Sequence, residues 1–333
     1  PIFSYLIFIV SKIFGYAHWY GRLINLIISS IGIFYFYKAV SSFINQKLAF
    51  VSTIILLCSL WFIFSRKSMP DTFSVSLVLV AIYYGISYLK SSKALYLVLY
   101  FLFMLLGILS KIPAIYLYPL FIVFIFSKEI ELKPKIIFSI FSVIIITIVF
   151  MWYFKWVPYL ESIDGNRLYF PRTLSEGFVE VKDNIGGLFE KFYFASLQSF
   201  VAFAFFIVGL YYVFKVQKSK ILISFILLNI VFIFFIIKTG VVFPTHSYYI
   251  LPYTPIMALI AGYGLVQIKN IKWIWIVLSV IVVESILNQQ NDFRINEKEL
   301  TLLRLEAIAD KVVSKNDLVA VNDGDNPQML YFI

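Results

Sequence analysis

Charged residues are scarce in this sequence. Only 14% of its 333 residues are Asp, Glu, Lys or Arg, whereas an average soluble domain has about 25%. Hydrophobic residues make up 61% of the chain and aromatic residues 20%. So few charges cannot cover a surface that faces water on all sides. The composition therefore excludes an ordinary soluble domain and predicts a membrane protein.

Cysteine and histidine are also rare. The single Cys58 lies in an apolar stretch, so a disulfide framework is excluded. The two histidines, His18 and His246, are far apart and form no Cys/His metal motif. Neither a Walker loop, a dinucleotide glycine pattern nor a nucleophile elbow is present. The sequence therefore predicts no cofactor and no metal cluster, and it leaves a requirement for a divalent metal open.

What the sequence does contain is a series of apolar blocks. Each is close to the roughly 20 residues that cross a ~30 Å hydrocarbon core as a helix. We therefore predict an all-α polytopic membrane protein with about ten transmembrane helices. The segment 1–15 is too short to span and carries Lys12, so we expect a helix in the outer interface. The predicted spans are 16–37, 48–64, 72–89, 94–110, 112–127, 136–154, 192–214, 221–237, 247–268 and 273–288.

Basic residues separate the loops into two alternating sets. One set is rich in lysine, and short cytoplasmic loops collect Lys and Arg, so we predict that this set is cytoplasmic. The other short turns carry only Arg66, Lys67, Lys111 and Lys238. The net charge of +10 thus reports topology and does not indicate nucleic acid. The cytoplasmic set is Lys38, Lys47, Lys90, Lys93, Lys128, Lys133, Lys135, Lys215, Lys218, Lys220, Lys269 and Lys272.

This assignment places the other loops on the outer face of a cell membrane. They are the turn "SRKSMPD", the turn at Lys111, the connection 155–191 and the turn "PTHS". The connection 155–191 combines charged residues with "DG" and "GG", so we expect an exposed loop with a short helix. The polar features of interest therefore share one side of the membrane.

The last part of the chain changes character. Residues 1–288 form the predicted transmembrane domain, and 289–333 read as the start of a small extracytoplasmic α/β domain. The segment "DLVAVNDGDNPQ" is typical of a strand followed by an Asp-Gly turn. Because the sequence begins at Pro1 and stops inside this unit, we expect it to be part of a longer protein. A helix is expected before this strand, because apolar residues recur at close to helical spacing at Leu300, Leu303, Leu305, Ile308 and Val312.

Two charged residues on the outer side have both a structural and a functional interpretation. Asp71 follows Pro70 at the start of a span, where a carboxylate serves as a helix cap or orients a cation in an outer cavity. Lys111 lies in a tight turn, where its ammonium extends to lipid headgroups or binds a phosphate. The N–H groups of the helix that Pro113 starts would face the same place.

The segment "FPTHSYYILPYTP" is a third polar feature. His246 is either a solvated or hydrogen-bonded histidine near a helix start or part of a site. Tyr248 and Tyr249 are typical of an interfacial aromatic belt. Composition and spacing alone thus indicate a polytopic protein with cationic and anionic groups gathered at its outer face, which is compatible with several functions.

Four blocks, in order, resemble a known family. They are "PIFSYLIFIVSKIFGYAHWYGRLINLI", "SRKSMPDTFSVSLVL", "GILSKIPAIYLYPLF" and "HSYYILPYTPIMALIAGYGL". Together they resemble the GT-C membrane glycosyltransferases, in the branch of the protein O-mannosyltransferases and the lipid A aminoarabinose transferase. The resemblance implies transfer of a sugar from a polyprenyl-phosphate carrier to an acceptor lipid, glycan or protein on the outer face. The implied partners are this carrier, the acceptor and membrane lipids, without nucleic acid.

The resemblance also implies site residues. Arg66 and Asp71 match the basic-then-acidic turn of the family. Lys111 matches its Thr-Lys-x-Pro turn, with Ser110 in place of Thr. His246 and Tyr249 fall in the block before its late Leu-Pro helix. These five residues are the implied substrate-binding set. The general base of the family lies in an outer loop upstream of the position of Pro1, so the catalytic residue is expected outside this sequence, with Asp71 as a supporting candidate.

Two other classes remain as alternatives. A secondary transporter would place binding groups near the midplane, on broken helices in paired halves. A flippase or polysaccharide polymerase would also be polytopic with a large outer loop. An acidic outer loop upstream of Pro1 would favour the transferase, whereas further spans with intramembrane charges would favour transport.

Overall fold

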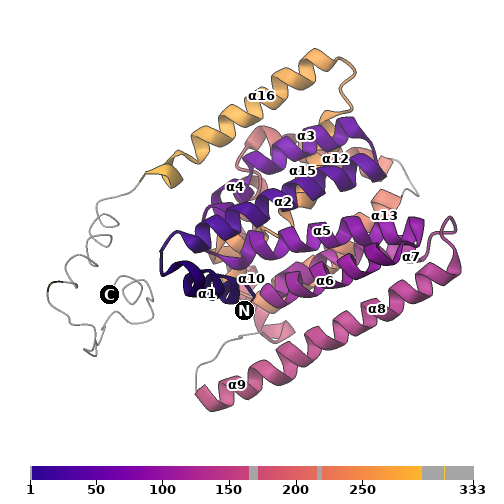
Figure 1. Ribbon diagram of the computed structural model, residues 1–333. Helices are drawn as coiled ribbons and strands as arrows, with labels where there is room; N and C mark the ends of the chain where they lie inside the picture. The colour runs from indigo at the N-terminus through magenta and orange to yellow at the C-terminus, as the bar shows by residue number, and fades with distance from the viewer. Residues whose placement is uncertain (1, 165–171, 216–219, 295–310, 312–333) are drawn as a thin grey trace. The chain divides into compact units, whose positions relative to one another are not determined.

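The computed structural model describes residues 2–164, 172–215, 220–294 and 311, and these are mostly helical (Figure 1). No strand occurs among them, so the all-α prediction for the membrane part is confirmed. The chain divides into two compact units, Pro1–Leu287 and Asn288–Ile333. In the second unit the short helix η5 (Gln290–Phe293) is described. The predicted α/β domain falls mostly on 295–310 and 312–333, outside the described residues.

The first half of the membrane unit consists of helices joined by short turns. Helix α5 is its centre, since it is buried along most of its length and packs against α2 on one side and α6 on the other (Figure 1). The predicted interfacial segment does form a helix, α1. The helices are α1 (Ile2–Phe14), α2 (Tyr20–Phe43), α3 (Gln46–Cys58), α4 (Leu60–Ser65), α5 (Pro70–Ser91) and α6 (Ala94–Ser110).

The second half contains more short and interrupted helices. It comprises η1 (Ile112–Leu117), α7 (Leu120–Ile125), α8 (Leu132–Met151), η2 (Trp152–Trp156), α9 (Val157–Asp164), α10 (Leu174–Asp183), α11 (Ile185–Glu190), η3 (Lys191–Ala195), α12 (Phe200–Lys215), α13 (Lys220–Thr239), α14 (Val242–Thr245), η4 (Ser247–Ile250), α15 (Thr254–Leu265) and α16 (Ile271–Asn288).

The predicted ten spans are not all present as continuous helices. By length and composition, five helices within the described residues are apolar and long enough to cross a membrane, or six if the bent pair Ile185–Ala195 and Phe200–Lys215 is one span. That pair bends by 95°, and the predicted span 48–64 is interrupted at Ser59. Apolar composition does not reveal such breaks, because the interrupted segments remain apolar.

The two breaks are hydrogen-bonded to each other. The backbone N–H of Leu60, freed by the end of α3, donates to the carbonyl of Ser196 at 3.0 Å. The hydroxyls of Ser196 and Thr254 lie 3.0 Å apart, and Ser59 Oγ accepts from the N–H of Trp61. Irregular backbone within a membrane needs internal partners of this kind. The break at Ser196 therefore supplies an acceptor for the N–H that the break at Ser59 frees.

In its described parts, 155–164 and 172–191, the connection is more helical than predicted. It holds the helices α9, α10 and α11, where the sequence suggested an exposed loop with one short helix. Helix α10 starts with a capping box, in which Thr173 accepts from the N–H of Glu176 and the Glu176 side chain accepts from the N–H of Thr173. The pattern Thr-x-x-Glu is a sequence signal for a helix start, but the prediction of a short helix here did not rest on it.

The structure also keeps the two sets of loops apart. The end of α2 at Ile44, the turn after α5 at Ser92 and the loop around Ser127 line one cavity. All three belong to the lysine-rich set. Lys111 instead contacts Tyr248 and Tyr249, which lie in the other set. These contacts agree with the predicted sorting for the loops that they join, and the assignment of sides stays a prediction.

Glycines allow α12 and α15 to approach closely. A Cβ atom on Gly209 would lie 2.0 Å from the carbonyl oxygen of Ile260, and one on Gly264 would lie 2.2 Å from that of Phe205. Both obstacles are backbone atoms, which cannot rotate away. Small residues at such crossings are typical of membrane helix packing, so this pair of glycines sets the distance between the two helices.

We expect Gly264→Ala to destabilise the protein by about 1 to 3 kcal/mol, the usual cost of overpacking. The added methyl group must push α12 and α15 apart. Thermal unfolding in detergent would measure the loss. Gly186→Ala is the matched control, since a Cβ on Gly186 meets no atom within 4 Å and alanine favours helix. Equal stability of the two variants would contradict the close contact.

Candidate functional site

An ion pair between Asp71 and Lys111 is the centre of the candidate site. Asp71 lies in the first turn of α5, after Pro70, and Lys111 follows the last residue of α6. The Lys111 ammonium donates to Oδ1 of Asp71. The Asp71 side chain is 4% exposed and that of Lys111 is 23% exposed. The carboxylate is therefore inside the protein, and the lysine connects it to the surface.

The packing of α5 on α6 fixes this pair. Ser74 Oγ donates to the carbonyl of Gly107 at 2.8 Å and reaches that of Lys111 at 3.1 Å. At the end of α6 these carbonyls also accept backbone N–H groups, that of Gly107 from Lys111 at 3.4 Å and that of Lys111 from Ala114 at 3.2 Å, and the Ser74 hydroxyl is an additional donor. Ser74 therefore attaches the backbone of Lys111 to the helix that carries Asp71.

A buried asparagine fixes the turn before Asp71. Asn25, on α2, is fully buried. Its amide nitrogen donates to the carbonyls of Phe64 and Lys67, each at 2.8 Å. Its amide oxygen accepts from Ser29 at 3.1 Å and Thr72 at 3.0 Å. Both amide hydrogens and two acceptor positions are used, so Asn25 holds α2, the α4–α5 turn and the start of α5 in one arrangement.

Two tyrosines cover the Lys111 ammonium. Its Nζ lies 4.4 Å from the ring centroid of Tyr248 and 5.3 Å from that of Tyr249. A cation within about 6 Å of an aromatic face is attracted to it. Lys111 thus lies between a carboxylate and two aromatic rings. These contacts fix the position of the ammonium group and leave N–H donors for a further acceptor.

Asp71 retains an unused acceptor. Its Oδ2 atom is buried and has no hydrogen-bond partner in the part of the chain that the structure describes. A buried polar atom without a partner costs about 1 to 3 kcal/mol, and such atoms are few in native proteins. A donor from a bound molecule would satisfy it.

The other predicted site residues, His246 and Arg66, lie near the surface of the protein. The ring of His246 is exposed, with centroid distances of 5.3 Å to Tyr248 and 6.4 Å to Tyr249, and its Nδ1 lies 2.8 Å from Thr245 Oγ1. Arg66 ends α4, and its guanidinium lies 4.7 Å from the ring of Phe62, on the preceding turn. Asp71, Lys111, Tyr249 and His246 are therefore brought together, whereas the role of Arg66 stays a prediction.

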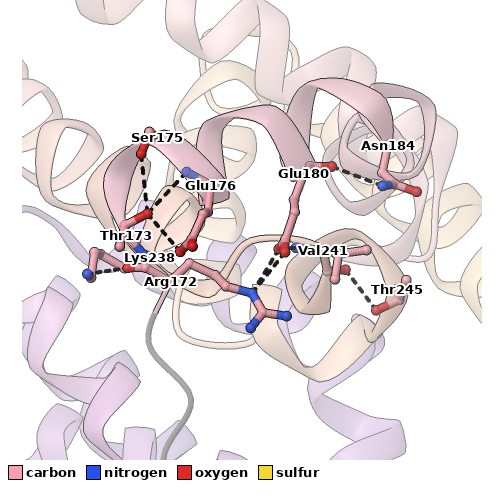
Figure 2. Close-up of polar contacts among 9 residues, drawn as sticks. All are labelled: Arg172, Thr173, Ser175, Glu176, Glu180, Asn184, Lys238, Val241 and Thr245. Atoms are coloured by element: carbon pink, nitrogen blue, oxygen red, sulfur yellow. Dashed lines mark hydrogen bonds and ion pairs between the residues drawn. The ribbon is translucent and has the colours of Figure 1, made fainter.

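A polar cluster on α10 holds the segment that leads to His246 (Figure 2). Arg172 Nε lies 2.9 Å from Oε1 of Glu180, and Glu180 Oε2 accepts from the N–H of Val241 at 2.8 Å. Gly240 has φ of +61°, and a Cβ there would lie 2.1 Å from the Glu180 carboxylate. Only glycine fits this position, so the carboxylate can approach the backbone of the turn.

Sequence reasoning missed this cluster. The hydrogen bond from Val241 is the main reason why the pKa of Glu180 is lowered, with the Arg172 side chain contributing. Glu180 therefore stays ionised at neutral pH. The capping box that starts α10 was the available signal, whereas nothing in the sequence pairs Glu180 with residues about 60 positions later.

One acidic residue outside the ion pair, Glu284, has a structural role. Glu284 on α16 accepts from the N–H groups of Phe200 at 2.9 Å and Val201 at 3.2 Å and from Ser199 Oγ, so it caps the start of α12. Within the described ranges, no group of three or more His, Cys, Asp or Glu side chains is arranged to hold a metal ion.

Comparison with known proteins gives the fold a family context. Residues 1–154 match the family model of dolichyl-phosphate-mannose-protein mannosyltransferases. The structure is similar to that of ArnT from Cupriavidus metallidurans bound to undecaprenyl phosphate, with a TM-score of 0.54 at 15% identity over 92% of this chain and 58% of that chain. For the apo state of ArnT the TM-score is 0.51 at 14% identity, over 95% of this chain and 55% of that chain.

Comparison with curated protein sequences gives no match. The chain spans somewhat more than half the length of the ArnT chains that it resembles. The match to the family model covers three of the helices that build the site, α2, α5 and α6. The predicted resemblance is confirmed, and the chain has the fold of the GT-C membrane glycosyltransferases, with the mannosyltransferase family pattern in its first 154 residues.

Proposed function

We propose that this protein transfers a sugar from a polyprenyl-phosphate carrier to an acceptor on the outer face of the membrane. The observation that carries the proposal is the Lys111 ammonium, held by buried Asp71 and two tyrosines at one end of α5. The similar ArnT structure is bound to undecaprenyl phosphate, a carrier of the kind that such a cation would recognise.

The chemistry of the leaving group explains the arrangement. In the transfer, the acceptor hydroxyl attacks the anomeric carbon, and the bond between that carbon and the phosphate oxygen breaks. The phosphate leaves with the electron pair, so its negative charge grows. A fixed ammonium at this place stabilises the developing charge. Lys111 would bind the phosphate, Tyr249 and His246 would line the entrance, and Arg66 would add a second cation.

Asp71 fits a supporting role better than that of general base. Its Oδ1 is engaged by Lys111 and its side chain is almost fully buried, so an acceptor hydroxyl has little access to it. Its unpaired Oδ2 is suited to accept a hydrogen bond from a sugar hydroxyl. The base that takes the acceptor proton is expected upstream of Pro1, as the family resemblance implies.

The alternatives of transport and flipping are less well supported. A transporter would place polar groups near the midplane of broken helices. Here the breaks at Ser59 and Ser196 bond to one another, and neither residue lines the cavity that Ile44, Ser92 and Ser127 border. The polar site instead lies at the first turn of α5.

The test is a transfer assay with the complete protein in vesicles, supplied with a polyprenyl-phosphate sugar that carries a radioactive label in the sugar. We expect the label to move to an acceptor and free polyprenyl phosphate to accumulate. Movement of intact labelled carrier between leaflets, without cleavage of the sugar–phosphate bond, would contradict the transferase and favour a flippase.

The orientation gives a separate prediction. In a Cys58→Ser background, a cysteine at Lys93 should resist an impermeant thiol reagent in intact cells, whereas one at Asp183 should react. Both positions are exposed, and the lysine-rich loops are expected in the cytoplasm. Permeabilised cells, in which both cysteines should react, are the control. The reverse pattern would place the proposed site on the cytoplasmic side.

A further inference from the structure

The tyrosines that cover Lys111 lie in a segment, 241–253, that is attached to other helices at both ends. At the end of the segment, the Tyr253 hydroxyl donates to Asn229 Oδ1 on α13 at 2.7 Å. At its start, the N–H of Val241 is held by a side chain of α10. The position of the tyrosines therefore depends on both attachments.

Helix α10 is itself attached to the end of α13, next to Val241 (Figure 2). A Cβ atom on Gly177 would lie 1.8 Å from the carbonyl oxygen of Ile237, so the backbones of the two helices are in contact. The N–H of Arg172 donates to the carbonyl of Lys238 at 3.0 Å, and the Lys238 ammonium donates to the carbonyl of Arg172. The attachment at Val241 therefore starts from a helix that is fixed in place.

Glu180 is the residue of α10 that reaches Val241. It lies three positions after Gly177, so both are on the face of α10 that meets α13. Its Oε2 accepts from the N–H of Val241 at 2.8 Å, and Arg172 Nε lies 2.9 Å from its Oε1 and 3.0 Å from its Oε2. Hydrogen bonds to an ionised group are roughly twice as strong as neutral ones. The guanidinium thus orients the carboxylate, and the carboxylate holds the backbone of the turn.

A series of hydrogen bonds connects Val241 to the tyrosines. Helix α14 has only four residues, and such a short helix is not stable by itself, so its conformation depends on contacts at its ends. Thr245 Oγ1 donates to the carbonyl of Val241 at 2.9 Å and lies 2.8 Å from Nδ1 of His246. The N–H of Tyr249 donates to the carbonyl of His246 at 3.3 Å. A displacement of Val241 would therefore move the rings that contact the Lys111 ammonium.

We propose that Glu180 is a positioning residue for the carrier site. Through Val241 it places the two tyrosine rings that hold the Lys111 ammonium at the phosphate of the carrier. Placement of this kind matters, since a shift of about 1 Å caused far from the reacting atoms can cost about 100-fold in rate. The inference rests on the proposed function for the role of the phosphate, whereas the attachment of the segment by Glu180 can be tested without a substrate.

The first measurement is hydrogen–deuterium exchange of the complete protein in nanodiscs without carrier. Glu180→Ala removes the acceptor for the N–H of Val241, so the amides of 241–250 should exchange several-fold faster, while those of α5 should not change. Glu190→Ala, at an exposed position of the same connection, is the matched control and should exchange like the parent. Equal exchange of 241–250 in Glu180→Ala and the parent would overturn the inference. Faster exchange throughout α5 would also overturn it, because it would indicate general destabilisation.

The second measurement is sugar transfer against the concentration of a polyprenyl-phosphate sugar. We expect Glu180→Ala to raise the KM for the carrier roughly tenfold and to lower kcat less, because the phosphate site is displaced and not removed. Glu180→Gln should recover most of the loss, since its amide oxygen can still accept from the N–H of Val241. An unchanged KM in Glu180→Ala, or a Glu180→Gln variant that is equally impaired, would overturn the inference. A parent protein that neither binds nor cleaves the carrier would contradict the proposed function, and the exchange of 241–250 would still decide whether Glu180 holds the segment.

Discussion

Lys111→Ala in the complete protein is expected to lower the efficiency of sugar transfer by roughly tenfold or more. The substitution removes a charge-assisted contact with the carrier phosphate, and such contacts contribute about 1.5 to 3 kcal/mol, where 1.36 kcal/mol corresponds to tenfold in rate. Lys111→Arg should retain part of the activity, since a guanidinium keeps the charge but binds in a wider, planar geometry. Transfer measured against carrier concentration gives the comparison.

The ion pair requires a control for folding. Removal of Lys111 leaves the carboxylate of Asp71 buried without its counter-ion, and an uncompensated buried charge is strongly destabilising. Asp71→Asn combined with Lys111→Ala should restore stability but not transfer. Lys93→Ala, an exposed lysine at the other end of the bundle, should have no effect. Normal kinetics in Lys111→Ala would remove the phosphate role and direct attention to Arg66 and His246.

Asn25→Leu is expected to destabilise the protein by about 3 kcal/mol or more. Four hydrogen bonds are lost, to the carbonyls of Phe64 and Lys67 and from the hydroxyls of Ser29 and Thr72. Phe64, Lys67 and Thr72 each keep another partner, so we count about 0.5 to 1.5 kcal/mol for each lost bond. Thermal unfolding in detergent measures the change.

The same variant should weaken binding of the carrier, because the turn that leads to Asp71 is no longer held against α2. At a temperature where the variant is still folded, the KM for carrier should rise more than kcat falls. Ser30→Ala, on the same helix but with an exposed hydroxyl, should alter stability by less than about 0.5 kcal/mol. An Asn25→Leu variant as stable as the parent would show that the network is dispensable.

Part of this site could be predicted from sequence because its residues lie in short patterns. Asp71 follows Pro70 at a helix start, and Lys111 precedes Pro113 in a tight turn. Both patterns depend only on residues that are neighbours in the sequence, so they can be recognised without knowledge of the rest of the fold. Consecutive transmembrane helices alternate in direction, so alternate loops are expected on the same side of the membrane. The contact between Lys111 and Tyr249 agrees with this assignment.

Other parts could not be predicted, because they depend on contacts between distant segments. Asn25 lies in an apolar span and gives no local sign that it bonds to residues about 40 positions later. Glu180 meets Val241 only because α10 folds against the end of α13. The number of continuous spans was overestimated for the same reason, since a break such as that at Ser59 is stable only when another segment supplies its hydrogen bonds.

The hydrogen bond between the break at Ser59 and the break at Ser196 has a consequence for how the two segments evolve. The interruption at Ser59 is not self-sufficient, since the N–H of Leu60 depends on a carbonyl more than 130 residues away. A chimera that replaces only the Ser196 segment with that of a relative without the matching break would leave this buried N–H without a partner. The two segments should therefore be gained, lost and exchanged together during evolution, as one unit that is discontinuous in the gene.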